Sequence, residues 1–296
     1  MLTCIDAHLP EELLSLLLDA PVFADFVDAD LAEFPASIRG YLLSWNLVFS
    51  AFSGASFKVR NDYIENIKTE NYVTPLLDFL SQSLGHSIGK PFNVEHARFT
   101  EEEIKAYKLS NSSPDREMQW VLLNIYYQAL EHTPNLVKSW WLSLKSKTTR
   151  LAIENWTQKY FTPFVIQGVL DQVQDWADNQ EPGTDTEKQL DVKVLRKARE
   201  IRAGYEVDDT EAEIVIKFPA TYPLEGTKVE GVRRVVANEK KWNSWMMIIQ
   251  GAIMFAVSMQ QSHIKPQILY TNAARKIEWQ HNRWPHHLPQ ERSGSP

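Results

Sequence analysis

Cysteine is almost absent from this chain of 296 residues, which contains a single one, Cys4. One thiol cannot form a disulfide bond within the chain or supply a cysteine-based zinc site. Its scarcity is typical of proteins from a reducing compartment. Glycine is also scarce, with 11 residues against 10 Trp, 10 Tyr and 13 Phe. Few glycines mean few tight turns, so the composition favours long helices over a many-stranded β-sandwich.

No segment has the sequence of a membrane anchor or a secretory leader. The longest apolar stretch, Trp245 to Val257, is interrupted by Gln250 and is shorter than the roughly 20 residues that a bilayer requires. The start of the chain carries Asp6 and Glu11 where a signal peptide has basic residues. We therefore expect no membrane partner.

Basic residues are missing from residues 1–38, which hold eight acidic residues. The formal net charge is −7, so the remainder of the chain has 31 basic residues against 30 acidic ones. This balance does not indicate a nucleic-acid-binding protein, although it allows a local basic surface.

Residues 1–178 carry apolar residues at spacings of three and four, which predicts a series of amphipathic helices. Pro10 begins one helix, Gly85 ends another, and Ser113 caps the clearest one. Thr133 and Pro134 separate that helix from the next. Short connections between the helices favour antiparallel packing of an α-solenoid kind, although no repeat of fixed period is present.

After residue 189 the apolar period becomes two, which predicts an antiparallel meander with one buried face. The residues predicted to point inward are Leu190, Val192, Val194, Ile201, Ala203, Tyr205, Val207, Ala212, Ile214, Ile216 and Phe218. Val215 is predicted to lie on the opposite, solvent-facing side. Lys228–Arg234 is consistent with a further strand, and Ala237–Met259 has a helical pattern. The predicted fold class is α+β, with an all-α region followed by a small antiparallel sheet and its covering helices.

The sequence offers no catalytic or metal-binding constellation and implies no cofactor. Gly85–Lys90 has three residues between its glycines and Pro91 after the lysine, so it does not form a phosphate loop. His96 and His132 are isolated and are interpreted as cap or surface residues. We therefore predict neither catalytic residues nor metal ligands.

Two local groups of basic residues stand out in the second half of the chain. The first has Lys193, Arg196, Lys197, Arg199 and Arg202 against Glu200, and the second has Arg233, Arg234, Lys240 and Lys241 against Glu239. Such residues can contact phosphates as point charges. They can equally be a solvated strand edge that lysine and arginine protect from aggregation, and the sequence alone does not decide between these interpretations.

The segment Phe218-Pro219-Ala220-Thr221-Tyr222-Pro223 follows the third predicted strand. It resembles the Tyr-Pro turn of RWD domains, which are relatives of the ubiquitin-conjugating enzyme fold. Proline fixes an extended exit from the sheet, and the tyrosine ring can pack over the turn. A conjugating enzyme needs a nucleophilic cysteine downstream of this turn, and no cysteine follows Cys4.

The order of several motifs narrows the resemblance to one family of proteins. Five segments follow one another in an order similar to the C-terminal part of the listerin family of RING-type ubiquitin ligases. They are Pro134–Trp141, Phe161 and its helix, the meander, Tyr222-Pro223-Leu224 and Lys241-Trp242-Asn243-Ser244-Trp245-Met246. The match covers roughly residues 110–258. It implies a HEAT-like helical region over 1–160 and an RWD domain over 161–259. Residues 260–296 are expected to be a disordered or aberrant tail in place of the RING.

The resemblance implies a role in ribosome-associated quality control, in the cytosol, with the large ribosomal subunit and the ribosome quality control complex as expected partners. Listerins dock on a large ribosomal subunit that holds a stalled nascent chain, and a RING domain directs ubiquitin from a conjugating enzyme to that chain. Zinc is expected in the family only through the RING, which this sequence lacks, so we expect no ubiquitin transfer by this chain alone. The residues expected to contact the ribosome are Arg196, Lys197, Arg199, Arg202, Arg233, Arg234, Lys240 and Lys241. The expected structural motif of the RWD domain comprises Phe218, Pro219, Tyr222, Pro223, Trp242 and Trp245. The alternative is an RWD scaffold that recruits another protein and does not contact the ribosome.

Overall fold

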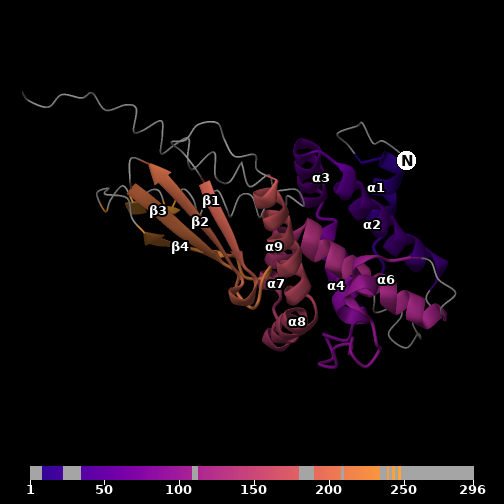
Figure 1. Cartoon of the computed structure of the whole chain (residues 1–296). Coiled ribbons are helices and arrows are strands. Elements are labelled where there is room, and N and C mark those ends of the chain that lie inside the picture. Colours follow the sequence, from indigo (N-terminus) through magenta and orange to yellow (C-terminus); the bar gives the residue numbers. More distant parts are fainter. Residues whose placement is uncertain are drawn as a thin grey trace, which may run out of the picture.

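The computed structural model of the chain describes residues 9–22, 35–108, 113–179, 190–207, 210–233, 239, 242–243 and 246–247. Helices make up the first part of this structure and strands the second, in the predicted order (Figure 1). The tail after residue 259 and the turn at Asp208-Asp209 lie outside the described residues, as does most of the predicted helix over 237–259.

The helical part begins with α1 (Glu11–Leu18), α2 (Ala36–Gly54), α3 (Phe57–Thr69) and α4 (Val73–Ser83). It continues with the short α5 (Glu101–Lys105), α6 (Pro114–His132), α7 (Pro134–Ser143), α8 (Lys147–Tyr160) and α9 (Thr162–Asp178). The α2 helix packs on α6, α4 packs on α7, and α8 packs on α9. Two of these contacts join helices that are distant in sequence, whereas α8 and α9 are successive.

Local sequence signals set several of these helix ends. The Oγ atom of Ser113 accepts a hydrogen bond from the backbone N–H of Arg116 (3.4 Å), at the predicted start of α6. Thr100 and Glu103 form a reciprocal capping box at the start of α5. Gly85 has a φ of 76° just after α4, a conformation that favours glycine because it has no Cβ.

A cluster of aromatic rings forms the centre of the helical core. Trp45, Phe49 and Phe52 on α2 are at most 1% exposed. The imidazole of His132, at the end of α6, stacks on Phe49 and Phe52 with ring-centroid distances of 5.8 and 5.4 Å. The interpretation of His132 as a cap or surface residue is therefore wrong. It is the last residue of its helix, yet its ring fills a gap between two phenylalanines and is only 3% exposed.

Because His132 is buried, the stability of the fold depends on pH under acidic conditions. Burial, with a smaller contribution from the nearby Arg60 charge, lowers the pKa of His132 to about 3 from 6.5. The unfolded chain therefore binds more protons than the folded chain, and stability falls as the pH drops from about 6.5 towards 3. Each such group contributes a slope of about 1.4 kcal/mol per pH unit in this window.

We expect His132→Gln to flatten the pH dependence of the unfolding free energy between pH 6 and pH 4, roughly the window between the two pKa values. Urea denaturation at several pH values measures this slope. His96→Gln, which changes an exposed side chain, is the control and should retain the wild-type slope. An unchanged slope in the His132 variant would contradict the assignment.

The second part of the structure is a four-stranded antiparallel sheet with the order β1-β2-β3-β4. Its strands are β1 (Leu190–Leu195), β2 (Glu200–Val207), β3 (Thr210–Lys217) and β4 (Lys228–Arg233), and the one-turn 3₁₀ helix η3 (Arg196–Ala198) follows β1. Ile216 on β3 pairs with Ile201 on β2 and with Val229 on β4. Because Ile201, Ala203, Ile214 and Ile216 are all buried, the predicted inward face of these strands is confirmed.

Val215 departs from the predicted alternation, because it lies on the opposite face of β3 and is still only 2% exposed. Its direct partners on the neighbouring strands are Arg202 and Glu230. Long charged side chains can cover apolar surface with their aliphatic stems while the charged ends stay in water. The outer face of β3 is therefore not uniformly exposed, because Val215 is buried there between two charged partners.

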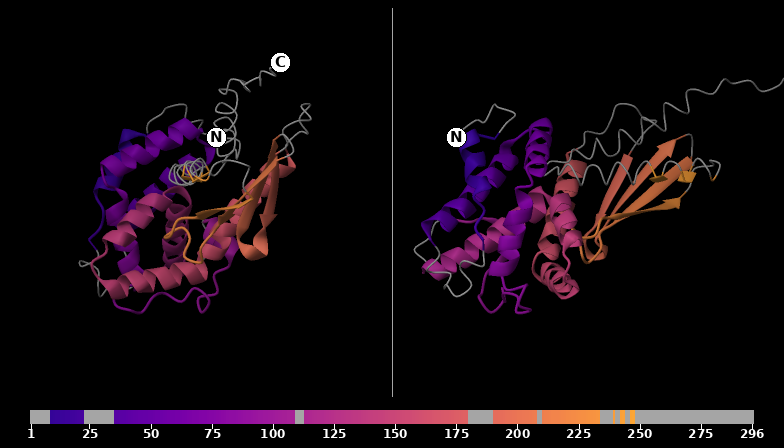
Figure 2. Two further views of the ribbon diagram at one scale, coloured as in Figure 1. Left: turned by 90° about the vertical axis from the view of Figure 1, so that its left-hand side faces the viewer. Right: turned by 180° about the vertical axis from the view of Figure 1, so that it is seen from behind.

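The α9 helix lies between the sheet and the other helices, and the views of Figures 1 and 2 agree on this arrangement. It packs on α8 on one side and on β1 on the other. The buried residues of the helices and the inward residues of the sheet form one continuous apolar core. None of the helices that the structure describes has both the length and the apolar character needed to cross a bilayer.

Candidate interaction surface

The Tyr-Pro turn between β3 and β4 is the point where the sheet meets the helices. Phe218 and Tyr222 are both buried, and their rings meet edge-on at a centroid distance of 5.2 Å. The backbone N–H of Tyr222 donates to the carbonyl of Pro219 (3.1 Å), which closes the turn, and the Tyr222–Pro223 peptide bond is cis. Burial raises the pKa of Tyr222 to about 12, so its hydroxyl stays protonated at neutral pH. Phe218, Tyr222 and Pro223 of the expected motif thus lie in a closed, buried turn.

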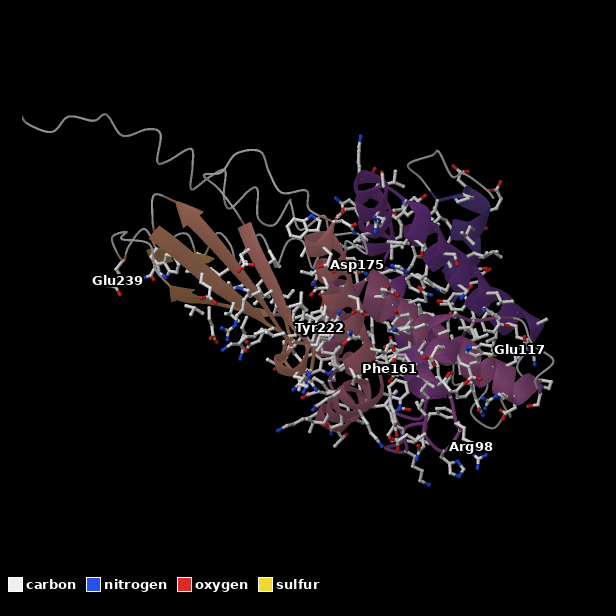
Figure 3. All side chains as sticks on the ribbon, in the orientation of Figure 1. Arg98, Glu117, Phe161, Asp175, Tyr222 and Glu239 are labelled. Atoms are coloured by element: carbon white, nitrogen blue, oxygen red, sulfur yellow. The ribbon has the colours of Figure 1, made fainter. Side chains whose placement is uncertain are left out.

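This turn is fixed to the first turn of α9. The buried hydroxyl of Thr162 donates a hydrogen bond to the backbone carbonyl of Tyr222, with an O···O distance of 2.6 Å. Leu224, two residues further on, is 1% exposed. Figure 3 shows Tyr222 and Phe161 close to the boundary between the strands and the helices. A hydrogen bond of this kind contributes about 1 kcal/mol, so the apolar burial around it is the main source of stability.

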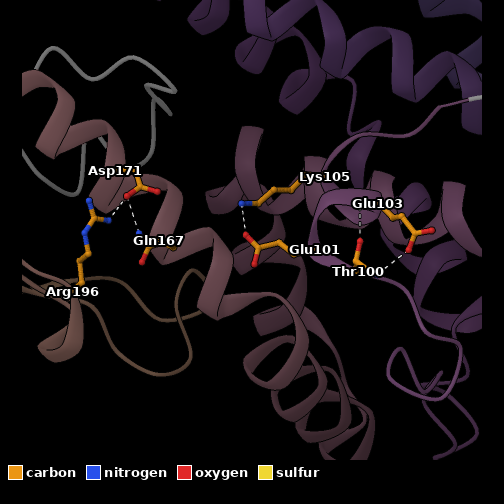
Figure 4. A network of polar contacts seen from close by, with 7 residues as sticks. All are labelled: Thr100, Glu101, Glu103, Lys105, Gln167, Asp171 and Arg196. Carbon is orange, nitrogen blue, oxygen red and sulfur yellow. Dashed lines mark hydrogen bonds and ion pairs between the residues drawn. The ribbon is translucent and has the colours of Figure 1, made fainter.

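Arg196 makes a second connection to α9. Its guanidinium donates to the carboxylate of Asp171, and the side-chain amide of Gln167 donates to the same carboxylate (2.7 Å) (Figure 4). The Arg196 and Asp171 side chains are 44% and 49% exposed, so this ion pair is worth less than about 1 kcal/mol. Its geometry nevertheless directs Arg196 towards α9, so this residue is already engaged within the chain.

The other basic residues of the first group differ in how freely they can meet a partner. Arg202 lies between Glu200 (3.8 Å) and Glu213 (3.7 Å) on the outer face of the sheet. Lys197 is exposed and Arg199 half-buried, and neither forms an ion pair with any residue that the structure describes. Lys197 and Arg199 are therefore the members of this group whose charge is available. We call these two residues the 197–199 turn.

Most of the second group lies outside the part of the chain that the structure describes. Arg233 ends β4, while Arg234, Lys240, Lys241 and Trp245 lie outside the described residues. Trp242 is buried, and its indole ring occupies the space that a β-carbon on Gly231 would need. Glycine at position 231 thus allows the Trp242 ring to lie directly on β4.

A third basic group, which the sequence analysis did not single out, lies on α7, on α8 and on the turn between them. The segment 134–160 has Lys138, Lys145, Lys147, Arg150 and Lys159 against a single acid, Glu154. A count of the charges along residues 134–160 is the sequence signal that identifies this group. The group is not obvious in the sequence, because its residues are spread over two amphipathic helices and the turn between them and do not form one short run.

The described residues contain nothing that resembles a catalytic centre. No three His, Cys, Asp or Glu side chains come close enough together there to hold a metal ion. His86 lies edge-on against Trp156 at 4.8 Å, and its Nδ1 atom is 3.2 Å from the carbonyl of Ser81. Burial lowers the pKa of His86 to about 4, so both buried histidines are neutral parts of the core at neutral pH.

Both parts of the chain match models of known protein families. Residues 2–174 match the HEAT repeat region of the LTN1 family, and residues 190–264 match a domain described as ubiquitin-conjugating domain-like. Over 253 residues, 84% of this chain, the sequence is 44% identical to the E3 ubiquitin-protein ligase listerin of Neurospora crassa. The chain belongs to the listerin family. The predicted order of a HEAT-like region followed by a conjugating-enzyme-like sheet is confirmed.

Two other listerins also match this chain, at lower sequence identity. The listerin of Schizosaccharomyces pombe is 31% identical over 84% of this chain, and that of Saccharomyces cerevisiae is 28% identical over 72% of it. The matched regions cover only 14–16% of the lengths of these three relatives. The chain thus spans about a sixth of the listerins that it matches.

Proposed function

We propose that this chain is the ribosome-docking segment of a listerin-type E3 ubiquitin ligase. In this proposal the ligase acts in the cytosol on stalled nascent chains of large ribosomal subunits, in ribosome-associated quality control. The observation that carries the proposal is the extended similarity to listerins, which includes both the HEAT region and the sheet. The available charges of the 197–199 turn supply a means of contacting ribosomal RNA.

We further assign the sheet to the RWD subgroup of the conjugating-enzyme-like fold. The buried Tyr222-Pro223 turn supports this assignment. Residues 190–264 contain no cysteine, so this domain cannot carry ubiquitin as a thioester. A RING also needs cysteine and histidine ligands for its zinc ions, and Cys4 is the only cysteine in the printed sequence. In our proposal these residues position the ligase, and ubiquitin transfer depends on a RING outside them.

The proposal predicts salt-dependent binding to the large ribosomal subunit. Replacing Lys197 and Arg199 by glutamine removes two available charges and leaves the Arg196–Asp171 ion pair in place. We expect weaker co-sedimentation with purified large subunits. The plot of log affinity against log salt concentration should become shallower by about 1 to 2, because each lost phosphate contact contributes roughly 0.7–0.9.

A variant with Lys58→Gln and Lys108→Gln is the matched control, because it removes the same charge from exposed positions on α3 and after α5. It should sediment like the wild type. If the wild-type chain does not sediment with large subunits, the docking proposal is wrong, and the alternative of an RWD scaffold for another protein is favoured.

A further inference from the structure

The α7 helix, the start of α8 and the turn between them carry basic residues that form no ion pair with any described residue. We define the α7–α8 corner by Lys138, Lys145, Lys147 and Arg150. Lys145 and Lys147 are exposed, Lys138 and Arg150 are half-buried, and none of the four forms an ion pair with a described residue. By contrast, Lys159 at the other end of α8 pairs with Glu95 (2.9 Å). The corner therefore holds uncompensated positive charge.

The backbone of the corner is held firmly in place. The indole N–H of Trp141 donates to the carbonyl of Arg150 (3.0 Å), which ties the first turn of α8 to the end of α7. The guanidinium of Arg150 lies 5.9 Å from the centre of the Trp141 ring. The Oγ atom of Ser146 caps α8 by accepting from the N–H of Thr149 (3.2 Å). The lysines thus project from a fixed base, and binding there does not require the backbone to be ordered first.

The chemistry of the corner fits a phosphodiester backbone. Lysine is a compact, flexible point charge that contacts phosphate without reading bases, and several such charges together bind a polyanion. The α9 helix packs both on α8 and on β1, and η3 follows β1 directly. One helix thus connects the element that carries the corner to the strand that precedes the 197–199 turn. Both groups can act on the same large polyanion.

We propose that the α7–α8 corner is a second contact with the RNA backbone, on the helical part of the chain rather than on the sheet. This inference rests on the proposed function, because the polyanion it names is the RNA of the large ribosomal subunit. It assigns the HEAT-like region a direct part in binding. Two contacts on elements joined through α9 strengthen each other, because the second forms at a high effective concentration once the first is made.

The test uses the full chain and purified large ribosomal subunits at several KCl concentrations. The triple variant Lys138→Gln, Lys145→Gln, Lys147→Gln removes three charges and keeps Arg150, which packs on Trp141. We expect its affinity to fall at least about tenfold at 150 mM salt and the salt plot to become shallower by about 2 to 3. The control triple variant Lys58→Gln, Lys68→Gln, Lys108→Gln has the same net charge and should bind like the wild type.

The outcomes separate this inference from the docking proposal. If the wild type binds and the corner variant binds equally well with the same salt dependence, the inference is wrong while ribosome docking stands. If the wild type itself does not bind, both fail. Leu142 and Leu151 are 54% and 45% exposed in the same region. A loss of binding on Leu142→Ser with Leu151→Ser, but not in the lysine variant, would show a protein contact instead and would also overturn the inference.

Discussion

Ile216→Asp is expected to unfold the sheet. Ile216 is 3% exposed, between Ile201 on one neighbouring strand and Val229 on the other. An aspartate there loses the apolar contacts and leaves a carboxylate without a partner in the core. Together these effects cost about 4 kcal/mol or more. Since domains are stable by only about 5–15 kcal/mol, this is a large part of the free energy of unfolding.

Limited proteolysis and thermal unfolding followed by circular dichroism measure this effect. We expect cleavage within residues 190–233 under conditions in which the wild-type sheet resists. The control is Val232→Asp on β4, where the valine is 50% exposed and the same charge can stay in water. If the Ile216 variant kept the wild-type melting temperature, the register of β3 described above would be wrong.

Phe161→Ala is the second substitution for which we expect a large effect. Phe161 is fully buried between α8 and α9, and its ring centroid lies 4.8 Å from that of Trp156 and 5.1 Å from that of Tyr126. Removing the ring leaves a cavity in the aromatic cluster next to the attachment point of the sheet. We expect a loss of about 3–5 kcal/mol of unfolding free energy.

Urea denaturation followed by tryptophan fluorescence suits this prediction, because Trp156 is in direct contact with the deleted ring. Leu142→Ala, at a side chain that is 54% exposed, serves as the control and should change stability by less than about 0.5 kcal/mol. A small effect of Phe161→Ala would mean that the α8–α9 junction collapses to fill the space.

Much of the fold is predictable from local patterns. The caps at Ser113 and Thr100 and the glycine at position 85 act through neighbouring backbone groups, so the sequence nearby is sufficient to locate the helix ends. The alternation through Ile214 and Ile216 likewise fixes which face of β3 is buried. Such signals depend only on residues a few positions apart.

The candidate site is less predictable, because its properties depend on residues distant in sequence. Arg196 and Lys197 are equivalent in a count of charges, yet Arg196 is engaged by Asp171, 25 positions earlier, and Lys197 is not. The geometry of the α7–α8 corner likewise depends on contacts that a count of charges does not contain, such as the hydrogen bond from the indole N–H of Trp141 to the carbonyl of Arg150.

The sequence by itself determined the order of helices and strands, the inward face of the meander and the membership of the listerin family. Periodicity, caps and motif order are properties of the linear chain. Only the tertiary structure decided that Val215 and His132 are buried and that α9 joins the sheet to the helices. It also decided which basic residues are free to meet a partner. These properties arise from long-range packing, in which the neighbours of a side chain are supplied by other elements of the fold.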